Sequence, residues 1–207
     1  KSGVDYSHIR RVHGYTTAMS LLAKFSDGSR SFVFNLSESA AAQLGPADFD
    51  KDLLKQVKWI HVSGFALSVS ESIARLHDMV MEEISEDVLV SFDPNYRNEM
   101  IDAALFRKRC RKVYDRCNLF LPSMGEAVLF EAGKDDLEAC AAAARKGKQV
   151  ALKAGRDGAY GFDGTECVYE PGFAAEETDP TGAGDTFGGA LIAALIEGME
   201  WKTALRF

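Results

Sequence analysis

The sequence predicts an α/β fold, a three-layer sandwich in which a mainly parallel sheet carries helices on both faces and a small β hairpin lies beside it. Short apolar runs typical of buried strands alternate with longer stretches of helical periodicity, and the order strand, helix, strand recurs about four times. The hairpin is indicated by two apolar-rich runs, residues 16–25 and 30–36, joined by Ser-Asp-Gly-Ser. Because no tandem repeat or low-complexity linker divides the chain, we expect a single domain over residues 1–207.

The composition is that of an ordinary globular protein and argues against several classes of function. The 207 residues are 46% hydrophobic and 27% charged, which is enough apolar material for one sizeable core. A net charge of -7 argues against nucleic acid or a membrane surface as the main partner. No apolar run approaches the roughly 18 residues of a membrane span, and the start has no signal-peptide pattern, so we expect a cytoplasmic protein. The four cysteines lack metal-ligand spacing and are expected to be free thiols.

Helices are predicted where apolar residues recur every three or four positions. The clearest case is residues 68–84, in which Ile73, Leu76, Val80 and Ile84 share one face. The helices predicted between the strands are residues 47–57, 68–84, 103–114, 127–130 and 136–147. The third of these is basic, and we expect its charges on a solvated face rather than against nucleic acid.

Strands are predicted where apolar runs are short and nearly continuous, as happens when both faces of a sheet are covered. These runs are residues 59–64, 88–92, 119–122 and 149–153, followed by a hairpin over residues 160–168 that turns at Asp-Gly. His61 lies within the first of these strands, and we interpret it as a packed core histidine rather than a catalytic group.

The most informative stretch is residues 178–187, Thr-Asp-Pro-Thr-Gly-Ala-Gly-Asp-Thr-Phe, which runs into a helix that begins near Ala183 and ends before Gly198. A glycine-rich turn that leads into a helix presents backbone N–H groups at the positive end of the helix dipole, which is a site for an anion such as phosphate. Asp185 falls in the first helical turn. The loop therefore offers donors for a phosphate and a carboxylate that can accept a hydroxyl proton.

Other interpretations of this loop compete with a phosphate site. The spacing of Gly182, Gly184 and Gly188 loosely resembles a dinucleotide fingerprint, but the preceding residues are polar rather than an apolar strand. The acidic residue expected about 20 positions further on is replaced by Ala204. A capped helix that packs closely on a sheet through small residues stays open as an alternative. A Walker loop is excluded because the sequence contains no G-x-x-x-x-G-K-[S/T].

Polar groups follow three of the predicted strands. Asp-Pro-Asn-Tyr-Arg at 93–97 places a carboxylate, an amide and a guanidinium just past a strand end, although turn chemistry around the proline is an alternative. Ser123 and Glu126 have the spacing of a capping box, which is a complete structural explanation for both. Lys153 ends a strand and leads into a glycine-containing turn at 154–160, which a simple connection between strands explains equally well.

The stretch Asp-Pro-Thr-Gly-Ala-Gly-Asp-Thr-Phe at 179–187 closely resembles the C-terminal motif of the ribokinase-like (PfkB) carbohydrate kinases. The resemblance implies the ribokinase-like α/β/α sandwich and extends over essentially the whole chain. It implies that Gly182, Ala183 and Gly184 form the anion hole for the transferred phosphoryl group, and that Asp185 is the base that activates the sugar hydroxyl.

The other polar clusters also resemble segments of this family. Residues 93–97 resemble its D-P-N-x-R segment, which implies that Asp93 and Asn95 contact the sugar and that Arg97 contacts phosphate or an acidic group, with Asp185 completing the substrate site. Residues 123–126 resemble its N-x-x-E segment, with Ser123 in place of asparagine, which implies that Glu126 arranges Mg²⁺ through water.

Two more sets of ligands follow from the same resemblance. Residues 153–158 resemble the K-x-G-x-x-G segment, which implies nucleotide contacts from Lys153, Gly155, Arg156 and Gly158, together with Gly184 of the anion hole. Many relatives bind a monovalent cation such as K⁺ beside the anion hole, and the matching residues here are Asp179 and Thr181.

The hairpin, residues 14–36, resembles the family's β lid, which covers the sugar and often carries a dimer contact. Phe32 and Phe34 fall on one face and would suit either role if exposed. Asn35 stands where relatives that phosphorylate keto-deoxy acids carry an arginine, which weakens an acidic-sugar assignment. Against the family pattern we expect N-terminal and C-terminal portions to be missing.

Taken together, the resemblance implies an ATP- and Mg²⁺-dependent sugar kinase, similar to a fructokinase or a 2-keto-3-deoxygluconate kinase, that acts as a homodimer. Two alternatives stay open, a nucleoside kinase of the same family and an inactive relative that binds sugar or nucleotide.

Overall fold

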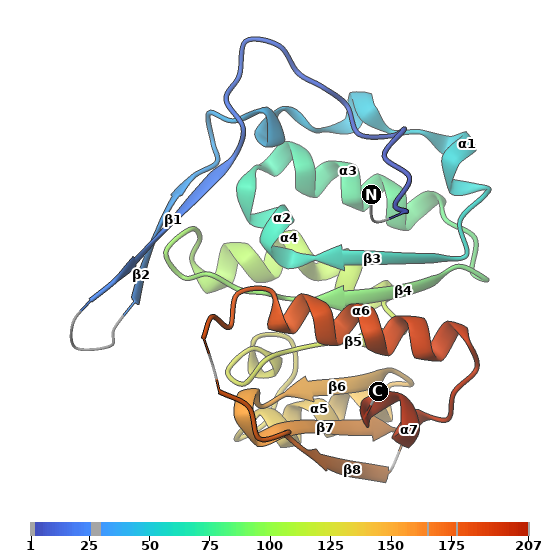
Figure 1. Cartoon of the computed structure of the whole chain (residues 1–207). Helices are drawn as coiled ribbons and strands as arrows, with labels where there is room; N and C mark the ends of the chain where they lie inside the picture. The colour runs from blue at the N-terminus through green and yellow to red at the C-terminus, as the bar shows by residue number, and fades with distance from the viewer. Residues whose placement is uncertain (1–2, 26–29, 165, 177, 207) are drawn as a thin grey trace.

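The computed structural model describes residues 3–25, 30–164, 166–176 and 178–206, and it contains one six-stranded sheet and one two-stranded sheet (Figure 1). The large sheet has the order β3-β4-β5-β6-β7-β8, in which β3 to β6 are parallel and β7 and β8 are antiparallel to their neighbours. Its strands are β3 (Trp59–Ser63), β4 (Leu89–Asp93), β5 (Leu119–Phe120), β6 (Gln149–Lys153), β7 (Gly158–Asp163) and β8 (Glu166–Pro171). The predicted mainly parallel sheet and the hairpin at its C-terminal side are confirmed.

Helices cover both faces of this sheet, as predicted. One face carries α2 (Gly64–Val69), α3 (Glu71–Glu83), α4 (Ala103–Arg116) and α5 (Asp136–Arg145), and the other carries α6 (Ala183–Ile196) and α7 (Trp201–Arg206). Within the described residues no helix is long and apolar enough to cross a membrane. The four cysteines are free thiols.

The two faces have different cores because alternate residues of each strand point to opposite sides. Toward α3, α4 and α5 the strands present large side chains, with Phe92 stacked on Phe120 at 6.0 Å between ring centroids and Phe130 packed edge-on against both. Toward α6 and α7 they present Leu121, Ala151 and other aliphatic residues. Gly188 of α6 faces this second core, where a Cβ atom would lie 3.4 Å from Leu121 Cδ1. The small residues of α6 therefore let this helix lie close to the sheet.

Three predicted helices differ from the observed ones. The helix expected over residues 47–57 is replaced by a 3-10 turn, η2 (Pro46–Asp48), and the short α1 (Lys51–Leu54), because the side chain of Asp50 caps a new helix start. The helix expected over 68–84 is interrupted by Ser70, which is extended and caps α3 through the N–H of Ile73. The helix expected over 127–130 is a 3-10 turn, η3 (Ala127–Leu129). Further 3-10 turns are η1 (Ala40–Gln43) and η4 (Gly155–Asp157).

The small sheet is the predicted hairpin, formed by β1 (Met19–Lys24) and β2 (Arg30–Asn35), and it projects from the body of the molecule (Figure 1). Its predicted turn, residues 26–29, lies outside the described residues. Phe32 and Phe34 stack at 5.7 Å, and Phe34 also contacts Phe65 of α2 at 5.6 Å, so both are half-buried rather than exposed.

The opposite face of the hairpin carries the exposed apolar groups. Leu21 and Val33 are paired across the strands and are 63% and 60% exposed, and Met19 beside them is 49% exposed. These three residues form an apolar patch on the projecting hairpin, which we call the hairpin patch.

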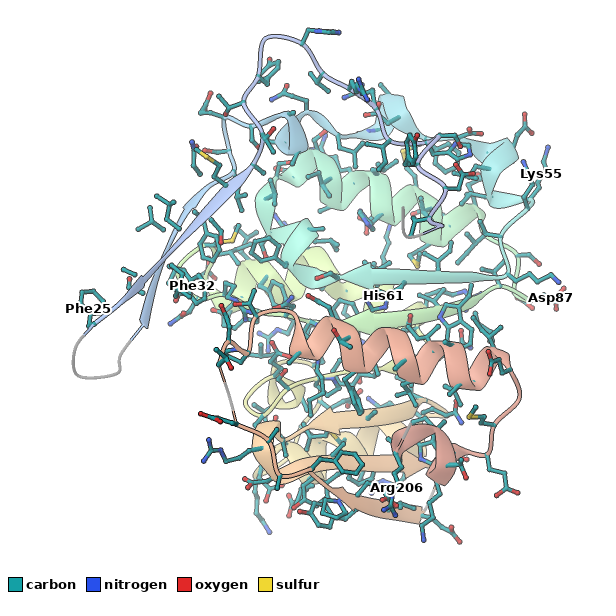
Figure 2. All side chains as sticks on the ribbon, viewed as in Figure 1. Phe25, Phe32, Lys55, His61, Asp87 and Arg206 are labelled. Carbon is teal, nitrogen blue, oxygen red and sulfur yellow. The ribbon has the colours of Figure 1, made fainter. Side chains whose placement is uncertain are left out.

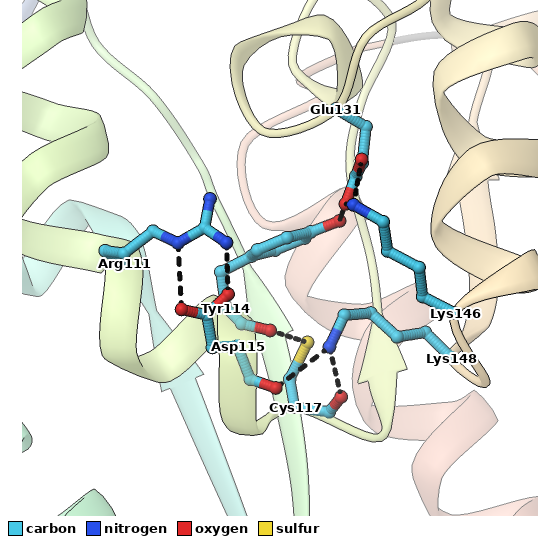
Figure 3. A network of polar contacts seen from close by, with 7 residues as sticks. All are labelled: Arg111, Tyr114, Asp115, Cys117, Glu131, Lys146 and Lys148. Carbon is cyan, nitrogen blue, oxygen red and sulfur yellow. Dashed lines mark hydrogen bonds and ion pairs between the residues drawn. The ribbon is translucent and has the colours of Figure 1, made fainter.

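A polar network ties α4 to the segment after β5 and to the end of α5 (Figure 3). The buried Tyr114 hydroxyl donates to Glu131 Oε1 at 2.7 Å, and Lys146 Nζ donates to both oxygens of Glu131 at 2.7 Å. Lys148 Nζ lies 4.9 Å from the centroid of the Tyr114 ring and donates to the carbonyl of Cys117. Burial acts to raise the pKa of Glu131, but the hydrogen bonds from Lys146 and Tyr114 outweigh it and leave the pKa lowered.

We expect Tyr114→Phe to lower the free energy of unfolding by about 1–2 kcal/mol, because it removes the hydrogen bond to the Glu131 carboxylate. The ion pair between Glu131 and Lys146 remains in the variant. Urea unfolding of the variant and of Tyr169→Phe measures this, since the Tyr169 hydroxyl also donates a hydrogen bond, to the carbonyl of Asp157, but is exposed. An equal and small effect of the two substitutions would contradict a stabilising role for the network.

Candidate active site

The predicted site residues meet at one edge of the large sheet. The parallel strands β3 to β6 all end at the edge where α6 begins and beside which the hairpin projects (Figure 1). At this edge Ser63 of β3 is paired with Asp93 of β4. The carboxyl ends of parallel strands are where α/β proteins bind ligands.

An ion pair connects two strands that are not neighbours. Lys153 Nζ, from the end of β6, donates to Asp93 Oδ2 at the end of β4 and so spans β5. The two side chains are only 12% and 4% exposed. A Cβ atom on Gly184 would lie 3.6 Å from Lys153 Nζ, which brings the first turn of α6 to the same point. Residues predicted separately for substrate and for nucleotide are therefore in contact.

The segment after β4 forms the turn around Pro94 and also contributes to the candidate site. Asp93 Oδ1 accepts a hydrogen bond from the N–H of Asn95 at 3.2 Å, and Asn95 has a φ of 43°, so the turn around Pro94 is present. Arg97 is half-buried and its Nη1 donates to the carbonyl of Tyr96 at 3.0 Å. Because the other oxygen of Asp93 binds Lys153, the turn orients this carboxylate instead of competing with the site.

Glu126 joins two strand-end loops. Its side chain is buried, Oε1 accepts from the N–H of Tyr96 at 2.7 Å, and Oε2 accepts from the N–H of Ser123 at 2.8 Å. Burial raises the pKa of Glu126, the two backbone hydrogen bonds and Lys153 act against this, and Asp93 adds to it. One half of the predicted capping box is thus formed, and the same carboxylate also reaches across to the segment after β4.

The turn after Lys153 is short and exposed. Gly155 and Arg156 are exposed in η4, and Gly158 has a φ of 107° at the start of β7. A Cβ atom on Gly158 would lie 2.1 Å from the carbonyl oxygen of Glu170. Packing against β8 therefore explains Gly158, while Gly155 and Arg156 face the solvent near the end of β6.

The start of α6 has an uncapped helix terminus. Gly182 is the N-cap with a φ of 81° and no side-chain cap, and Asp185 is exposed in the first turn. The N–H of Ala183 donates to the carbonyl of Pro180 at 3.1 Å, so this one of the three predicted anion-hole amides takes part in the turn. The described residues between β8 and α6 form no strand, which rules out the dinucleotide fingerprint.

The two residues matched to a monovalent-cation site lie next to each other. Asp179 Oδ1 accepts from the N–H of Thr181 at 3.0 Å and from its Oγ1 at 2.7 Å. Both residues are exposed. The pair is therefore held as a turn that presents oxygen atoms just before the anion-hole residues.

His61 is not the packed core histidine that the sequence predicted. Because β3 is an edge strand of the described sheet, His61 is exposed, and it stands between β3 and α6 (Figure 2). Its Nδ1 lies 2.9 Å from the buried Ser91 Oγ, which also accepts from Trp59 Nε1 at 3.0 Å. The protein around it still desolvates part of the exposed ring, which lowers the pKa of His61; Asp93 and Asp185 act to raise this pKa and Lys153 adds to the lowering.

The alternation of side chains along the strands could have indicated that His61 lies beside the candidate site. Trp59, His61 and Ser63 alternate on one strand, Ser91 and Asp93 alternate on the next, and parallel pairing brings the two polar rows together. The missing information was the position of β3, which is an outer strand of the described sheet and leaves the ring exposed.

Comparison with known proteins identifies the family. The family model for pfkB family carbohydrate kinases matches residues 1–207. The chain belongs to this family. It is 27% identical over its whole length to the 2-dehydro-3-deoxygluconokinase of Bacillus subtilis strain 168 and 28% identical over 95% of its length to the probable fructokinase-3 of Arabidopsis thaliana. The chain spans 65% and 58% of the length of these two proteins, less than two thirds of each.

Solved structures agree with this family assignment. A protein described as a ribokinase II from E. coli, solved in complex with ATP and Mg²⁺, matches 92% of the chain with a TM-score of 0.83 and 30% sequence identity, and the match covers 61% of that protein. A PfkB protein from Polaromonas sp. JS666 matches 93% of the chain and 64% of its own length with a TM-score of 0.79 and 25% identity. The ribokinase-like α/β fold predicted from the sequence is thereby confirmed.

The residues at the sheet edge suit a Mg²⁺ ion that arrives bound to a nucleotide. They are less suited to a Mg²⁺ site made of protein ligands alone. Among the residues that the structure describes, no group of three or more His, Cys, Asp or Glu side chains could hold a metal ion. Mg²⁺ in phosphoryl-transfer sites keeps several waters and binds one or two carboxylates together with phosphate oxygens. Glu126 and Asp93 are carboxylates available for such a role, each already oriented by backbone N–H groups.

We expect Glu126→Gln to destabilise the fold by about 1–3 kcal/mol, because an amide offers one acceptor oxygen and leaves the N–H of Tyr96 or Ser123 without a partner. Thermal or urea unfolding measures the loss, with Glu138→Gln as the matched control, since Glu138 is exposed and accepts a hydrogen bond from the N–H of Lys134. An unchanged stability of Glu126→Gln would mean that the two loops do not depend on this carboxylate.

Proposed function

We propose that the protein containing this chain is an ATP-dependent sugar kinase that transfers the γ-phosphoryl group to a sugar hydroxyl. The observation that carries the proposal is that the first turn of α6, which contains Gly184 and Asp185, meets the Lys153–Asp93 pair in a pfkB-family chain. Kinases need little covalent chemistry from the protein, and their catalysis consists mainly of positioning and charge stabilisation. Each of these residues can supply one of those contributions.

In the proposed reaction the Asp185 carboxylate accepts the proton of the sugar hydroxyl as that oxygen forms a bond to the γ-phosphorus. The bond between the γ-phosphorus and the bridging oxygen breaks, and ADP leaves with the electron pair. The amides of Gly182, Ala183 and Gly184 stabilise the negative charge that develops on the phosphoryl oxygens, and for this the N–H of Ala183 would leave the carbonyl of Pro180. The Lys153 ammonium adds a positive charge at the same place.

The remaining predicted contacts complete the site in this proposal. Asp93 and Asn95 bind sugar hydroxyls, and Arg97 binds phosphate or an acidic group of the substrate. Lys153, Gly155, Arg156 and Gly158 line the nucleotide, with the exposed turn of Gly155 and Arg156 toward its phosphates.

Metal ions have the supporting roles that the family resemblance implies. Mg²⁺ bound to ATP supplies charge neutralisation between the phosphates, and Glu126 would hold its water ligands. Asp179 and Thr181 would contribute oxygen ligands to K⁺ beside the anion hole. We place the reaction in the cytoplasm, in line with the composition.

The substrate class proposed is a neutral or acidic monosaccharide, in line with the fructokinase and 2-dehydro-3-deoxygluconokinase names of the relatives. The exposed Asn35, in place of an arginine, favours the neutral sugar.

We expect Asp185→Asn to lower kcat by roughly 10²- to 10⁴-fold, the usual contribution of a general base. A coupled assay of ADP release by the full-length protein measures this, with Mg·ATP and a panel of hexoses, pentoses, sugar acids, sugar phosphates and nucleosides, with and without K⁺. The matched control is Asp52→Asn, another exposed aspartate in a first helical turn.

The outcomes of this assay separate the candidates. Turnover of a sugar that is lost only in Asp185→Asn supports the sugar kinase, while turnover confined to nucleosides would replace it by a nucleoside kinase. ATP binding without turnover on any acceptor would indicate an inactive relative, and near-normal turnover of Asp185→Asn would remove this residue from the mechanism.

We further propose that the hairpin acts as a lid over the sugar and that the hairpin patch is the contact of a homodimer. The face with Phe32 and Phe34 is tied to the body through Phe65, which follows directly from the end of β3. The hairpin patch, Met19, Leu21 and Val33, points the other way and is exposed. Exposed apolar groups gathered on a projecting element are typical of an interaction surface.

We expect Leu21→Lys combined with Val33→Lys to raise the dimer dissociation constant of the full-length protein by at least about tenfold, since both charges would be buried in the contact. Light scattering over a concentration series gives the mass, with Phe173→Lys as a control, because Phe173 is 73% exposed outside the hairpin. A dimer that persists in the double variant, or a monomeric wild type, would contradict the proposed contact.

A further inference from the structure

The ion pair between Asp93 and Lys153 joins two residues to which the proposed function gives different ligands. Asp93 is assigned to the sugar, and Lys153 is assigned to the phosphates of the nucleotide. In the structure Lys153 Nζ donates to Asp93 Oδ2, and the lysine and aspartate side chains are 12% and 4% exposed. The contact within the pair and the contacts to the two ligands therefore compete for the same atoms.

The pair engages the oxygen of Asp93 that a sugar hydroxyl would need. Oδ1 accepts the N–H of Asn95 at 3.2 Å, and Oδ2 accepts Lys153. An ionised carboxylate can accept about four hydrogen bonds. At 4% exposure, however, Asp93 presents almost no surface while Lys153 is bonded to it. A sugar hydroxyl that donates to Asp93 must therefore displace the ammonium from Oδ2 or share this oxygen with it.

The pair also limits what Lys153 can offer to a phosphate. An ammonium bonded to a carboxylate forms a nearly neutral unit, so it attracts a phosphate much less than an unpaired ammonium does. The proposed phosphate site is close, because a Cβ atom on Gly184 would lie 3.6 Å from Lys153 Nζ. The lysine side chain is flexible and its N–H donors rotate freely. A small movement of Nζ away from Asp93 would therefore bring it to the phosphates.

We propose that the Asp93–Lys153 pair couples the binding of the two substrates, because a sugar hydroxyl that binds Asp93 releases Lys153 to the phosphates of ATP. The inference rests on the proposed function, from which it takes the sugar and nucleotide roles of the two residues. Both substrates require the same pair to open, so each one raises the affinity for the other by the same factor. Without a sugar Lys153 stays with Asp93, which disfavours transfer of the γ-phosphoryl group to water.

The test is calorimetric titration of the full-length protein with a non-hydrolysable ATP analogue and Mg²⁺, with and without a saturating concentration of the sugar that turns over. We expect the sugar to lower the dissociation constant of the analogue by roughly 5- to 150-fold, the usual range for coupling between two sites. In Asp93→Asn this effect should fall below about twofold, because a neutral amide is a much weaker partner for Lys153.

The matched control is Asp185→Asn, which also removes a negative charge beside Gly184 but leaves the ion pair intact. This variant should keep the wild-type effect of the sugar on the affinity for the analogue. Without sugar, Asp93→Asn should bind the analogue more tightly than Asp185→Asn does, because only the first substitution frees Lys153.

A structural measurement on the wild type covers the case in which Asp93→Asn does not fold. In a crystal structure of the full-length protein with the sugar alone, we expect a sugar hydroxyl at Asp93 Oδ2 and Lys153 Nζ more than about 3.5 Å from this oxygen. An ammonium still bonded to Asp93 beside the bound sugar would overturn the proposal.

The titrations can overturn the proposal in three ways. Saturating sugar could leave the affinity of the wild type for the analogue unchanged or weaken it. The sugar could act on Asp93→Asn as strongly as on the wild type. Asp185→Asn could lose the effect to the same degree as Asp93→Asn, in which case the loss of a negative charge alone would explain it.

Failure of the proposed function is distinguishable from failure of this inference. If no sugar turns over, the proposed function fails. The affinities of Asp93→Asn and Asp185→Asn for the analogue alone then still decide whether the pair holds Lys153 back from a phosphate, and equal affinities would overturn that role.

Discussion

The candidate site depends on the buried ion pair between Asp93 and Lys153. A lysine ammonium and a carboxylate this deeply buried are tolerated only when they satisfy each other, since each alone would lose its hydration without compensation. The pair fixes the ends of β4 and β6 across β5, and the first turn of α6 comes to the same ammonium through Gly184. One interaction therefore sets the distance between the segment proposed to bind sugar and the segment proposed to bind nucleotide.

The packing of the two sheet faces supports this arrangement. On one face, large aromatic side chains fix the strands against α4 and the segment after β5, and Glu126 links the loops at the strand ends. On the other face, small residues let α6 lie close to the sheet. The first turn of this helix therefore reaches Lys153 at the end of β6. The amides proposed to stabilise charge and the carboxylate proposed to accept the proton belong to α6 on this second face.

Much of the fold followed from the sequence because its signals are local. The apolar runs, the turn at Asp163 and Gly164 and the glycine-rich entry into α6 each specify an element by themselves. The errors arose where a single polar residue overrode the periodicity, as Asp50 and Ser70 do by capping new helix starts inside one apolar pattern.

The site was predictable as a set of residues but not as a set of contacts. Family motifs indicated Asp93, Glu126, Lys153 and Asp185, yet the Lys153–Asp93 pair and the bridge from Glu126 to Tyr96 join segments at least 30 residues apart in sequence. His61 was misread for the same reason, because its exposure depends on the place of β3 at one edge of the sheet that the described residues form, which only the strand order reveals.

The central claim is that phosphoryl transfer takes place where α6 begins beside the Asp93–Lys153 pair. A crystal structure of the full-length protein with Mg²⁺, a non-hydrolysable ATP analogue and the sugar that turns over tests it most directly. The account predicts the γ-phosphate at the Gly182–Gly184 amides and near Lys153, with the acceptor hydroxyl within about 3.2 Å of the Asp185 carboxylate. Phosphates bound away from the start of α6, or a sugar whose hydroxyls do not reach Asp185, would contradict it.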